Sequence, residues 1–163
     1  DVEGDHLLDT QELEGLYPKA AFLDSREVVL FGEKGFVLYQ ADSKKIETQE
    51  NFESEINSVF CTNQKLGFIF KNEDDNGKYR MEIYNKAGKK SSTYYFDLDY
   101  SGMTADDDEV ILYNDEEMLI YQVGGRVRFR GTFNTAVTSV MPSWEDGLYW
   151  LIDDQSLREI RIR

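Results

Sequence analysis

A repeated pair of apolar segments, each ending in an aromatic residue, restricts the folds open to this chain more than any other feature. Val28–Phe31 is followed by a four-residue polar turn and then by Phe36–Tyr39, and Val110–Tyr113 is followed in the same way by Met118–Tyr121. In both copies eight positions separate the two terminal aromatic residues. Short β-branched and aromatic runs joined by turn residues are typical of β-hairpins. The sequence therefore predicts a repeated hairpin.

Two further copies follow the same plan with different turn lengths. Leu66–Phe70 precedes Tyr79–Tyr84 across a longer loop, and Leu148–Ile152 precedes Leu157–Ile162. The second segments end at positions 39, 84, 121 and about 161, so the spacings are 45, 37 and about 40 residues. A period of about 40 residues is typical of the blades of β-propellers.

Each hairpin also has flanking segments that complete a four-stranded unit. A short run of small or apolar residues precedes each hairpin: Ala20–Leu23, Ser58–Cys61, Ser101–Thr104 and Thr138–Met141. A polar-edged run follows each of the first three: Lys45–Thr48, Ser92–Phe96 and Arg126–Arg130. Small residues suit the crowded axis of a propeller, and charged outer strands protect a sheet edge from pairing with another chain. We therefore expect an all-β, β-propeller-like fold with about four blades of four-stranded antiparallel sheet.

The predicted blades span about residues 17–52, 56–97, 100–134 and 137–163 of one domain. The fourth unit stops after its third strand. Three interpretations are open: a closed four-blade ring in which the segment around Asp5–Leu8 supplies the missing strand, part of a larger propeller, or a stack of hairpins that is not a propeller. An incomplete ring can also be completed by a second copy of the chain or by another chain.

The charge of the chain restricts its partners. Asp and Glu number 32 against 18 Lys and Arg, which gives a net charge of −14. Such a surface repels phosphate groups, so we expect no nucleic-acid binding and no direct binding to a membrane surface. High net charge commonly serves solubility, and it also suits a cation or a basic partner. The single cysteine, Cys61, lies in an apolar run and predicts an inert thiol.

Two acidic segments are candidates for cation binding. Asp106, Asp107 and Asp108 form a run just before an apolar strand, and we take them as the candidate metal ligands, calcium being the cation they suit. The alternative is a solvated loop between strands. Asn72–Gly77 resembles the start of a calcium loop, but Ile83 stands where the pattern requires a glutamate, so a hairpin turn is the favoured interpretation.

The sequence predicts no catalytic residue and no cofactor-binding residue. His6 is the only histidine and lies near the terminus, which leaves no conventional zinc site. Trp144 follows Pro142 and Ser143 in a predicted loop, and we take it as the candidate contact for a ligand. Trp150 alternates within a strand and is expected in the core.

Several segments of the C-terminal part resemble an uncharacterised β-propeller family of Gram-positive bacteria that carries a domain of unknown function. The similar segments are Ile83–Lys89, Val110–Asn114, Ile120–Tyr121 and Asp154–Arg163. Similar Tyr-Asn-Lys-x-Gly-Lys runs recur in quinoprotein-like and WD-type blades. The resemblance implies an N-terminal membrane anchor, an extracytoplasmic propeller with more blades than are present here, and no catalytic residues. No run of about 18 apolar residues is visible, but the chain begins at Asp1, so an anchor could have been removed.

Together these observations predict a non-enzymatic β-propeller that acts as a binding or scaffold module at the bacterial cell envelope. Its partner is expected to be a protein or a carbohydrate, and a membrane is contacted only through the absent anchor. A cytoplasmic location stays open. The alternative function is a propeller hydrolase or lyase that uses acidic residues with a divalent cation.

Overall fold

The computed structural model describes residues 10–162, which form fifteen β-strands and no helix. The strands make four antiparallel sheets in chain order, here named blades 1 to 4. Blade 1 contains β1 (Lys19–Phe22), β2 (Glu27–Phe31), β3 (Gly35–Gln40) and β4 (Lys45–Asn51). Blade 2 contains β5 (Ile56–Cys61), β6 (Lys65–Lys71), β7 (Tyr79–Asn85) and β8 (Lys90–Phe96). Blade 3 contains β9 (Gly102–Ala105), β10 (Glu109–Tyr113), β11 (Glu117–Gln122) and β12 (Val127–Thr132). Blade 4 contains β13 (Ser139–Pro142), β14 (Leu148–Ile152) and β15 (Leu157–Arg161).

Each sheet is a meander in which every strand pairs with the next strand along the chain. The predicted all-β, propeller-like fold is therefore confirmed, and the fourth sheet has three strands in the described part of the chain. The first strand of blade 3, β9, contacts the first strands of blades 2 and 4, β5 and β13, which places these strands on the inner side of the assembly. The interpretation that residues 5–8 supply a strand to blade 4 lies outside the described residues.

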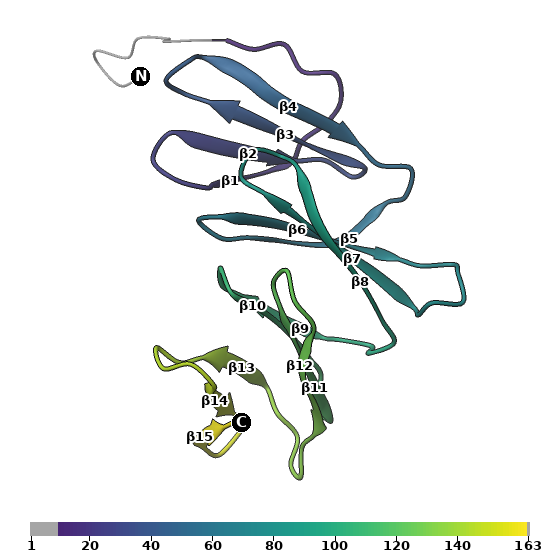
Figure 1. The fold of residues 1–163 in the computed structure, drawn as a ribbon, viewed down its shortest axis with the longest axis vertical. Helices are drawn as coiled ribbons and strands as arrows, with labels where there is room; N and C mark the ends of the chain where they lie inside the picture. Colours follow the sequence, from purple (N-terminus) through teal and green to yellow (C-terminus); the bar gives the residue numbers. More distant parts are fainter. Residues whose placement is uncertain (1–9, 163) are drawn as a thin grey trace.

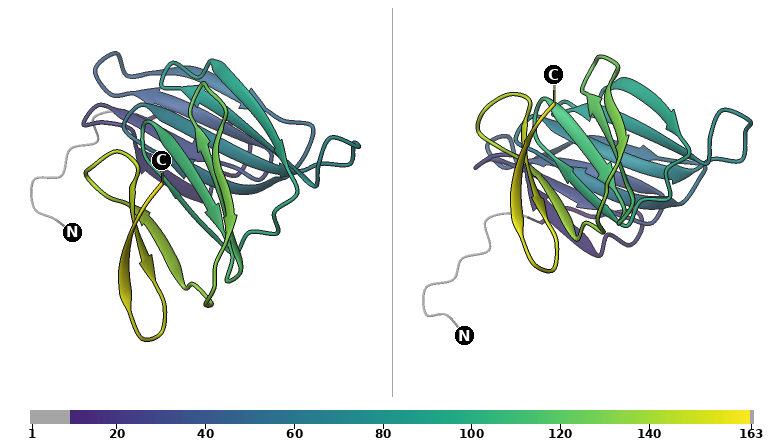
Figure 2. Two further views of the ribbon diagram at one scale, coloured as in Figure 1. Left: turned by 60° about the horizontal axis from the view of Figure 1, so that its bottom comes forward. Right: turned by 90° about the horizontal axis from the view of Figure 1, so that it is seen from below.

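The four sheets follow one another in an open arc, with blade 1 and blade 4 at opposite ends of the molecule (Figures 1 and 2). Three hydrophobic clusters hold the arc together, and each of them joins two consecutive sheets. Within residues 10–162 no such cluster joins blade 4 to blade 1. Residues 10–162 thus form an open arc and not a closed four-blade ring (Figure 1).

The cluster between blades 1 and 2 is rich in stacked and edge-on rings. Phe68 has no exposed surface and lies with its ring centroid 4.9 Å from that of Phe36 and 5.4 Å from that of Tyr84. Phe31 and Phe52 surround the same ring at 6.0 and 5.1 Å. Aromatic pairs at these separations add about 0.5–1.5 kcal/mol each to the free energy gained from burial. This interface is therefore the most aromatic part of the core.

The turn between the first two strands is built in the same way in three blades. Asp24 Oδ1 accepts hydrogen bonds from the amides of Arg26 and Glu27, and Asp106 Oδ1 accepts them from the amides of Asp108 and Glu109. In blade 2 the hydroxyl of Thr62 takes this role. Side-chain oxygens of Asp and Thr stabilise tight turns by accepting hydrogen bonds from amides two and three residues on. The first residue of the Asp106–Asp108 run thus has a structural role.

Two sequence-based interpretations concern individual loops and side chains. Residues 72–78 connect β6 and β7, and the amide group of Asn72 donates hydrogen bonds to the carbonyls of Asp74 and Gly77, so the segment is a hairpin loop as favoured. Trp150 was expected in the core but is only half-buried. It faces away from blade 3, and the neighbouring Tyr149, 1 % exposed, occupies the core position instead.

Candidate functional site

A cleft of about 520 Å³ lies between the turns of blade 3 and the β13–β14 loop of blade 4. Blade 3 contributes the β9–β10 turn with Asp106 and Asp108, and the β11–β12 turn with Gly124 and Gly125. Blade 4 contributes residues 142–149, which include Trp144. Two of the three acidic residues singled out in the sequence are thereby brought to the same cleft as the singled-out tryptophan.

The base of the cleft is a network of hydrogen bonds and ion pairs around Glu109. Glu109 is 6 % exposed at the start of β10; Arg128 donates a hydrogen bond to its Oε1, and the hydroxyl of Tyr149 donates one to its Oε2 at 2.5 Å. Arg128 also donates a hydrogen bond to Oδ1 of Asp146 at 2.6 Å, and this bond lowers the pKa of that carboxyl. Because Arg128 comes from blade 3 and Tyr149 from blade 4, the network joins the two blades below the cleft.

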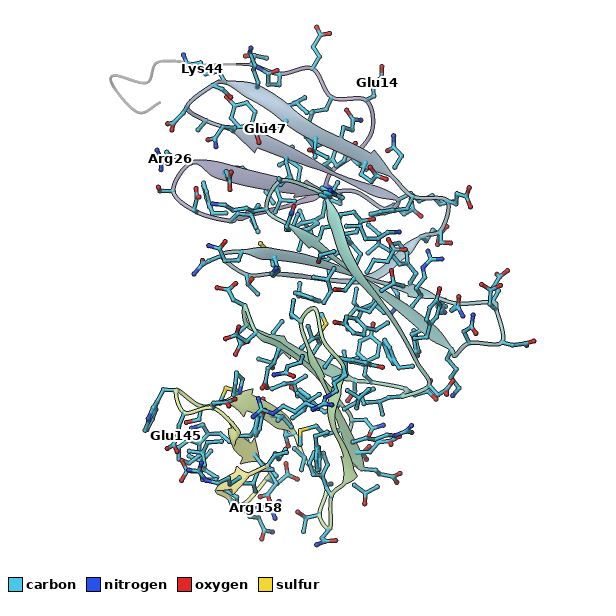
Figure 3. The ribbon with its side chains drawn as sticks, viewed as in Figure 1. Glu14, Arg26, Lys44, Glu47, Glu145 and Arg158 are labelled. Carbon is cyan, nitrogen blue, oxygen red and sulfur yellow. The ribbon has the colours of Figure 1, made fainter. Side chains whose placement is uncertain are left out.

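The loop of blade 4 makes this cleft different from the equivalent region between the turns of blades 2 and 3. In that region the side chain of Asp107 contacts blade 2, where its carboxylate accepts hydrogen bonds from the hydroxyl of Thr62 at 2.5 Å and the amide of Gln64 at 3.1 Å. The β13–β14 connection, residues 143–147, is longer than the β9–β10 connection, residues 106–108. It carries Trp144, which is 89 % exposed. Figure 3 labels the next residue, Glu145, on the same projecting loop.

The three candidate metal ligands have different surroundings. Asp106 holds its own turn, Asp107 contacts blade 2, and Asp108 lines the cleft. Residues 10–162 contain no group of three or more His, Cys, Asp or Glu side chains arranged to hold a metal ion. Calcium binding by the run therefore stays a prediction, and it would require these side chains to rearrange. His6 lies outside the described residues.

Two other features bear on the class of function. Burial raises the pKa of the Cys61 thiol, which is opposite to the shift that activates a nucleophilic cysteine. In the described part of the chain no helix has the length and hydropathy of a membrane span.

Sequence analysis missed the residues at the base of the cleft. Glu109, Arg128 and Asp146 come from separate turns and strands, and only their placement in space reveals the network. One signal was present in the sequence: Glu109 opens the strand Glu-Val-Ile-Leu-Tyr, every residue of which is buried. A charged residue in such a strand requires a partner of opposite charge.

Buried tyrosines should make the stability of the protein depend on alkaline pH. Burial raises the pKa of both Tyr84 and Tyr149 well above the usual value, and the carboxylates of Glu82 and Glu109 that accept their hydrogen bonds add to the shifts. The folded state therefore retains protons that the unfolded state loses above about pH 10, so the stabilisation is complete below that pH and falls as the pH rises. We expect a fall of at least about 1 kcal/mol between pH 10 and 11.5, since one pKa unit corresponds to about 1.4 kcal/mol. Urea unfolding at several pH values measures the fall, and a smaller fall in Tyr149→Phe than in the wild-type chain checks its source.

Comparison with known proteins supports the fold. The computationally designed Ika4 protein aligns over 98 % of this chain and 99 % of its own, with a TM-score of 0.63 and 11 % identity. BBS1N, solved in complex with ARL6DN, aligns over 98 % of this chain and 56 % of its own, with a TM-score of 0.61 and 13 % identity. Hsv2 from Kluyveromyces lactis aligns over 89 % of this chain and 46 % of its own, with a TM-score of 0.56 and 9 % identity.

These structures are propeller-like, and at such low identity they show the fold alone. The chain spans about half the length of BBS1N and of Hsv2. None of the curated protein sequences compared with the chain matches it. The model of a family of unknown function, DUF5711, matches residues 2–162, and the chain therefore belongs to this family.

Proposed function

We propose that the chain is a non-enzymatic binding module that holds a basic, extended segment of a protein partner in the cleft between blades 3 and 4. The observation that carries this proposal is the position of Trp144, 89 % exposed at the edge of the cleft. Tryptophan side chains are highly buried on average, and tryptophan is enriched among the residues that dominate binding energies.

The charge of the cleft favours a basic ligand. Five acidic residues line it: Asp106, Asp108, Glu109, Glu145 and Asp146. The only basic residue among the lining residues is Arg128, and Glu109 and Asp146 both bind it. A cationic side chain over the face of Trp144 gains about 0.5–2 kcal/mol, and the surrounding carboxylates add electrostatic attraction that salt weakens.

The cell envelope is the location we propose for this activity, because the resemblance to anchored extracytoplasmic propellers points there. An envelope protein with a net charge of −14 avoids anionic lipid headgroups and presents an acidic surface to basic partners. The hydrolase or lyase alternative gains no observation in its favour, and two of the carboxylates of the cleft, Glu109 and Asp146, are both paired with Arg128.

Replacement of Trp144 by Ala tests the proposal. We expect labelled peptides of about eight residues with several Arg and Lys to bind the wild-type chain, and Trp144→Ala to weaken binding at least tenfold, the effect of removing about 1.4 kcal/mol. Fluorescence anisotropy at low and at physiological salt measures the affinity. The stability should change by less than about 0.5 kcal/mol because the side chain is exposed.

The matched control is Tyr95→Ala, an aromatic residue that is 41 % exposed on β8, away from the cleft. It should leave peptide affinity unchanged. Equal binding of acidic and basic peptides, or equal affinity in the wild-type chain and Trp144→Ala, would refute the proposal. Binding of neutral oligosaccharides through Trp144 in place of basic peptides would change the class of ligand to carbohydrate.

A further inference from the structure

The two ends of the arc each expose one face of a sheet whose counterparts elsewhere in the molecule are buried. In blade 1 the outward face is formed by residues that pair across the strands, with Phe22 opposite Val28 and Leu30 opposite Val37. Cross-strand partners lie on the same face of a sheet. The opposite face of this blade, with Val29 among its residues, packs on blade 2.

The outward face of blade 1 carries the residue pattern of a blade-to-blade interface. By the hairpin repeat, Val28, Leu30 and Val37 correspond to Val110, Leu112 and Leu119 of blade 3. These three residues of blade 3 are at most 4 % exposed because they pack on blade 2. In blade 1, where no preceding blade is present in the described chain, Val28 and Leu30 are only half-buried and Phe22 is 73 % exposed, whereas Val37 in the middle of the sheet has no exposed surface. An apolar hollow of about 260 Å³ lies on this face, bordered by these strands and by Leu13.

The outward face of blade 4 carries residues whose counterparts in the other blades pack on the next blade along the chain. Trp150, Ile152 and Leu157 correspond to Ile111, Tyr113 and Met118, which are at most 8 % exposed against blade 4. In blade 4 Leu157 is 61 % exposed, and Met141, opposite Trp150, is 40 % exposed. One residue on this face of blade 4 is charged: Glu159 occupies the position that Ile120 has in blade 3.

The two exposed faces are different and complementary. Each interface inside the chain joins two different faces. One blade contributes the face that is exposed on blade 4, and the next blade contributes the face that is exposed on blade 1. Figure 3 shows how far apart the two exposed faces lie: Lys44 and Glu47 mark the blade 1 end, and Arg158 marks the blade 4 end. Blade 4 therefore cannot cover blade 1 of its own chain, but it can cover blade 1 of another.

We propose that a second copy of this chain completes the ring, with blade 4 of each copy packed on blade 1 of the other. When two copies related by a twofold rotation contact each other head to tail, the assembly is a closed ring. The two copies then form two identical interfaces, which bury the outward faces of both blades 1 and both blades 4. The size of the arc agrees with this arrangement, since the four blades align with about half of each of two propeller-like chains. This inference uses a different surface from the proposed peptide site and does not depend on it.

The mass of the 163-residue chain in solution tests the proposal. Light scattering at tens of micromolar protein should give twice the 19.0 kDa of one chain. Because each copy carries a charge of −14, the dimer should tighten when salt is raised from about 50 to 500 mM. A mass of 19.0 kDa under all of these conditions would overturn the proposal.

Two variants identify the faces involved. Phe22→Glu places a charge on blade 1 and Leu157→Lys places one on blade 4, at side chains that are exposed in the single chain, so both variants should fold and both should be monomers. Circular dichroism checks the folding. Val127→Glu is the matched control, since Val127 is 46 % exposed on β12 of an inner blade, and it should remain a dimer.

A mixture of the two monomeric variants distinguishes a head-to-tail contact from a symmetric one. In the mixture blade 4 of the Phe22→Glu chain can pack on the unaltered blade 1 of the Leu157→Lys chain, which restores one of the two interfaces. We therefore expect dimers to return on mixing. A dimer that one variant disrupts and the other leaves intact would show pairing of identical faces, and it would overturn the proposed ring.

Discussion

Replacement of Phe68 by Ala is expected to lower the free energy of unfolding by about 3–5 kcal/mol. Phe68 has no exposed surface, and it lies at the centre of the cluster that joins blades 1 and 2, with its ring against Phe36 and Tyr84. Truncation removes the transfer free energy of a phenyl ring and leaves a cavity that rings from two sheets border. The strands on either side are fixed by hydrogen bonds, so the cavity can collapse only in part.

Urea unfolding at neutral pH and a fixed protein concentration measures this loss. Tyr95→Ala is the control because it removes a ring of similar size that is 41 % exposed, and it should cost less than about 1 kcal/mol. A loss in Phe68→Ala no greater than in this control would show that the interface between blades 1 and 2 contributes little to stability.

Replacement of Arg128 by Met should lower the free energy of unfolding by about 3 kcal/mol. Arg128 is the cation that Glu109 binds, and Glu109 is 6 % exposed. Without the guanidinium, Glu109 keeps only the hydroxyl of Tyr149 as a hydrogen-bond donor among its described contacts. The buried carboxylate is then charged without an ionic partner, which is unfavourable in a medium of low dielectric constant.

Two further variants separate the ion pair from other effects of the substitution. Arg130→Met removes an arginine from the same strand whose side chain is 58 % exposed and lies 3.5 Å from Glu117, so it should cost less than about 1 kcal/mol. Combining Arg128→Met with Glu109→Leu should recover part of the loss, because an apolar pair has no uncompensated charge. A double variant less stable than Arg128→Met alone would contradict this explanation.

The blade architecture was predictable because two features of the sequence repeat together. These are the spacing of the apolar segments and the aromatic residues at the ends of those segments. Tyr84 and Tyr121, each one residue before the end of the third strand of its blade, both pack against the preceding blade. Alternation within a strand shows which residues share a face, but it does not show which of the two faces meets the larger core. For this reason Trp150 was expected in the core, a position that Tyr149 occupies.

The candidate site was predictable only in its exposed parts. Trp144 could be placed in a loop because Pro142 and Gly147 bound the segment, and acidic runs are visible in any sequence. The pairing of Glu109 with Arg128 depends on the register between β10, β11 and β12, and the approach of Tyr149 depends on how blade 4 packs on blade 3. The sequence shows a charged residue, Glu109, at the start of an apolar strand, but the identity of its partners is set by tertiary packing.

The restriction of every hydrophobic cluster to two consecutive sheets has a consequence for how the protein forms during synthesis. No described cluster requires the last strands before the first ones can pack, so blades 1 and 2 can join while blade 4 is still being translated. The aromatic interface between blades 1 and 2 then gives the nascent chain a stable beginning, to which each later sheet is added in turn. Among the described residues blade 4 packs on blade 3 alone, so this interface can form only after the first three sheets have been translated.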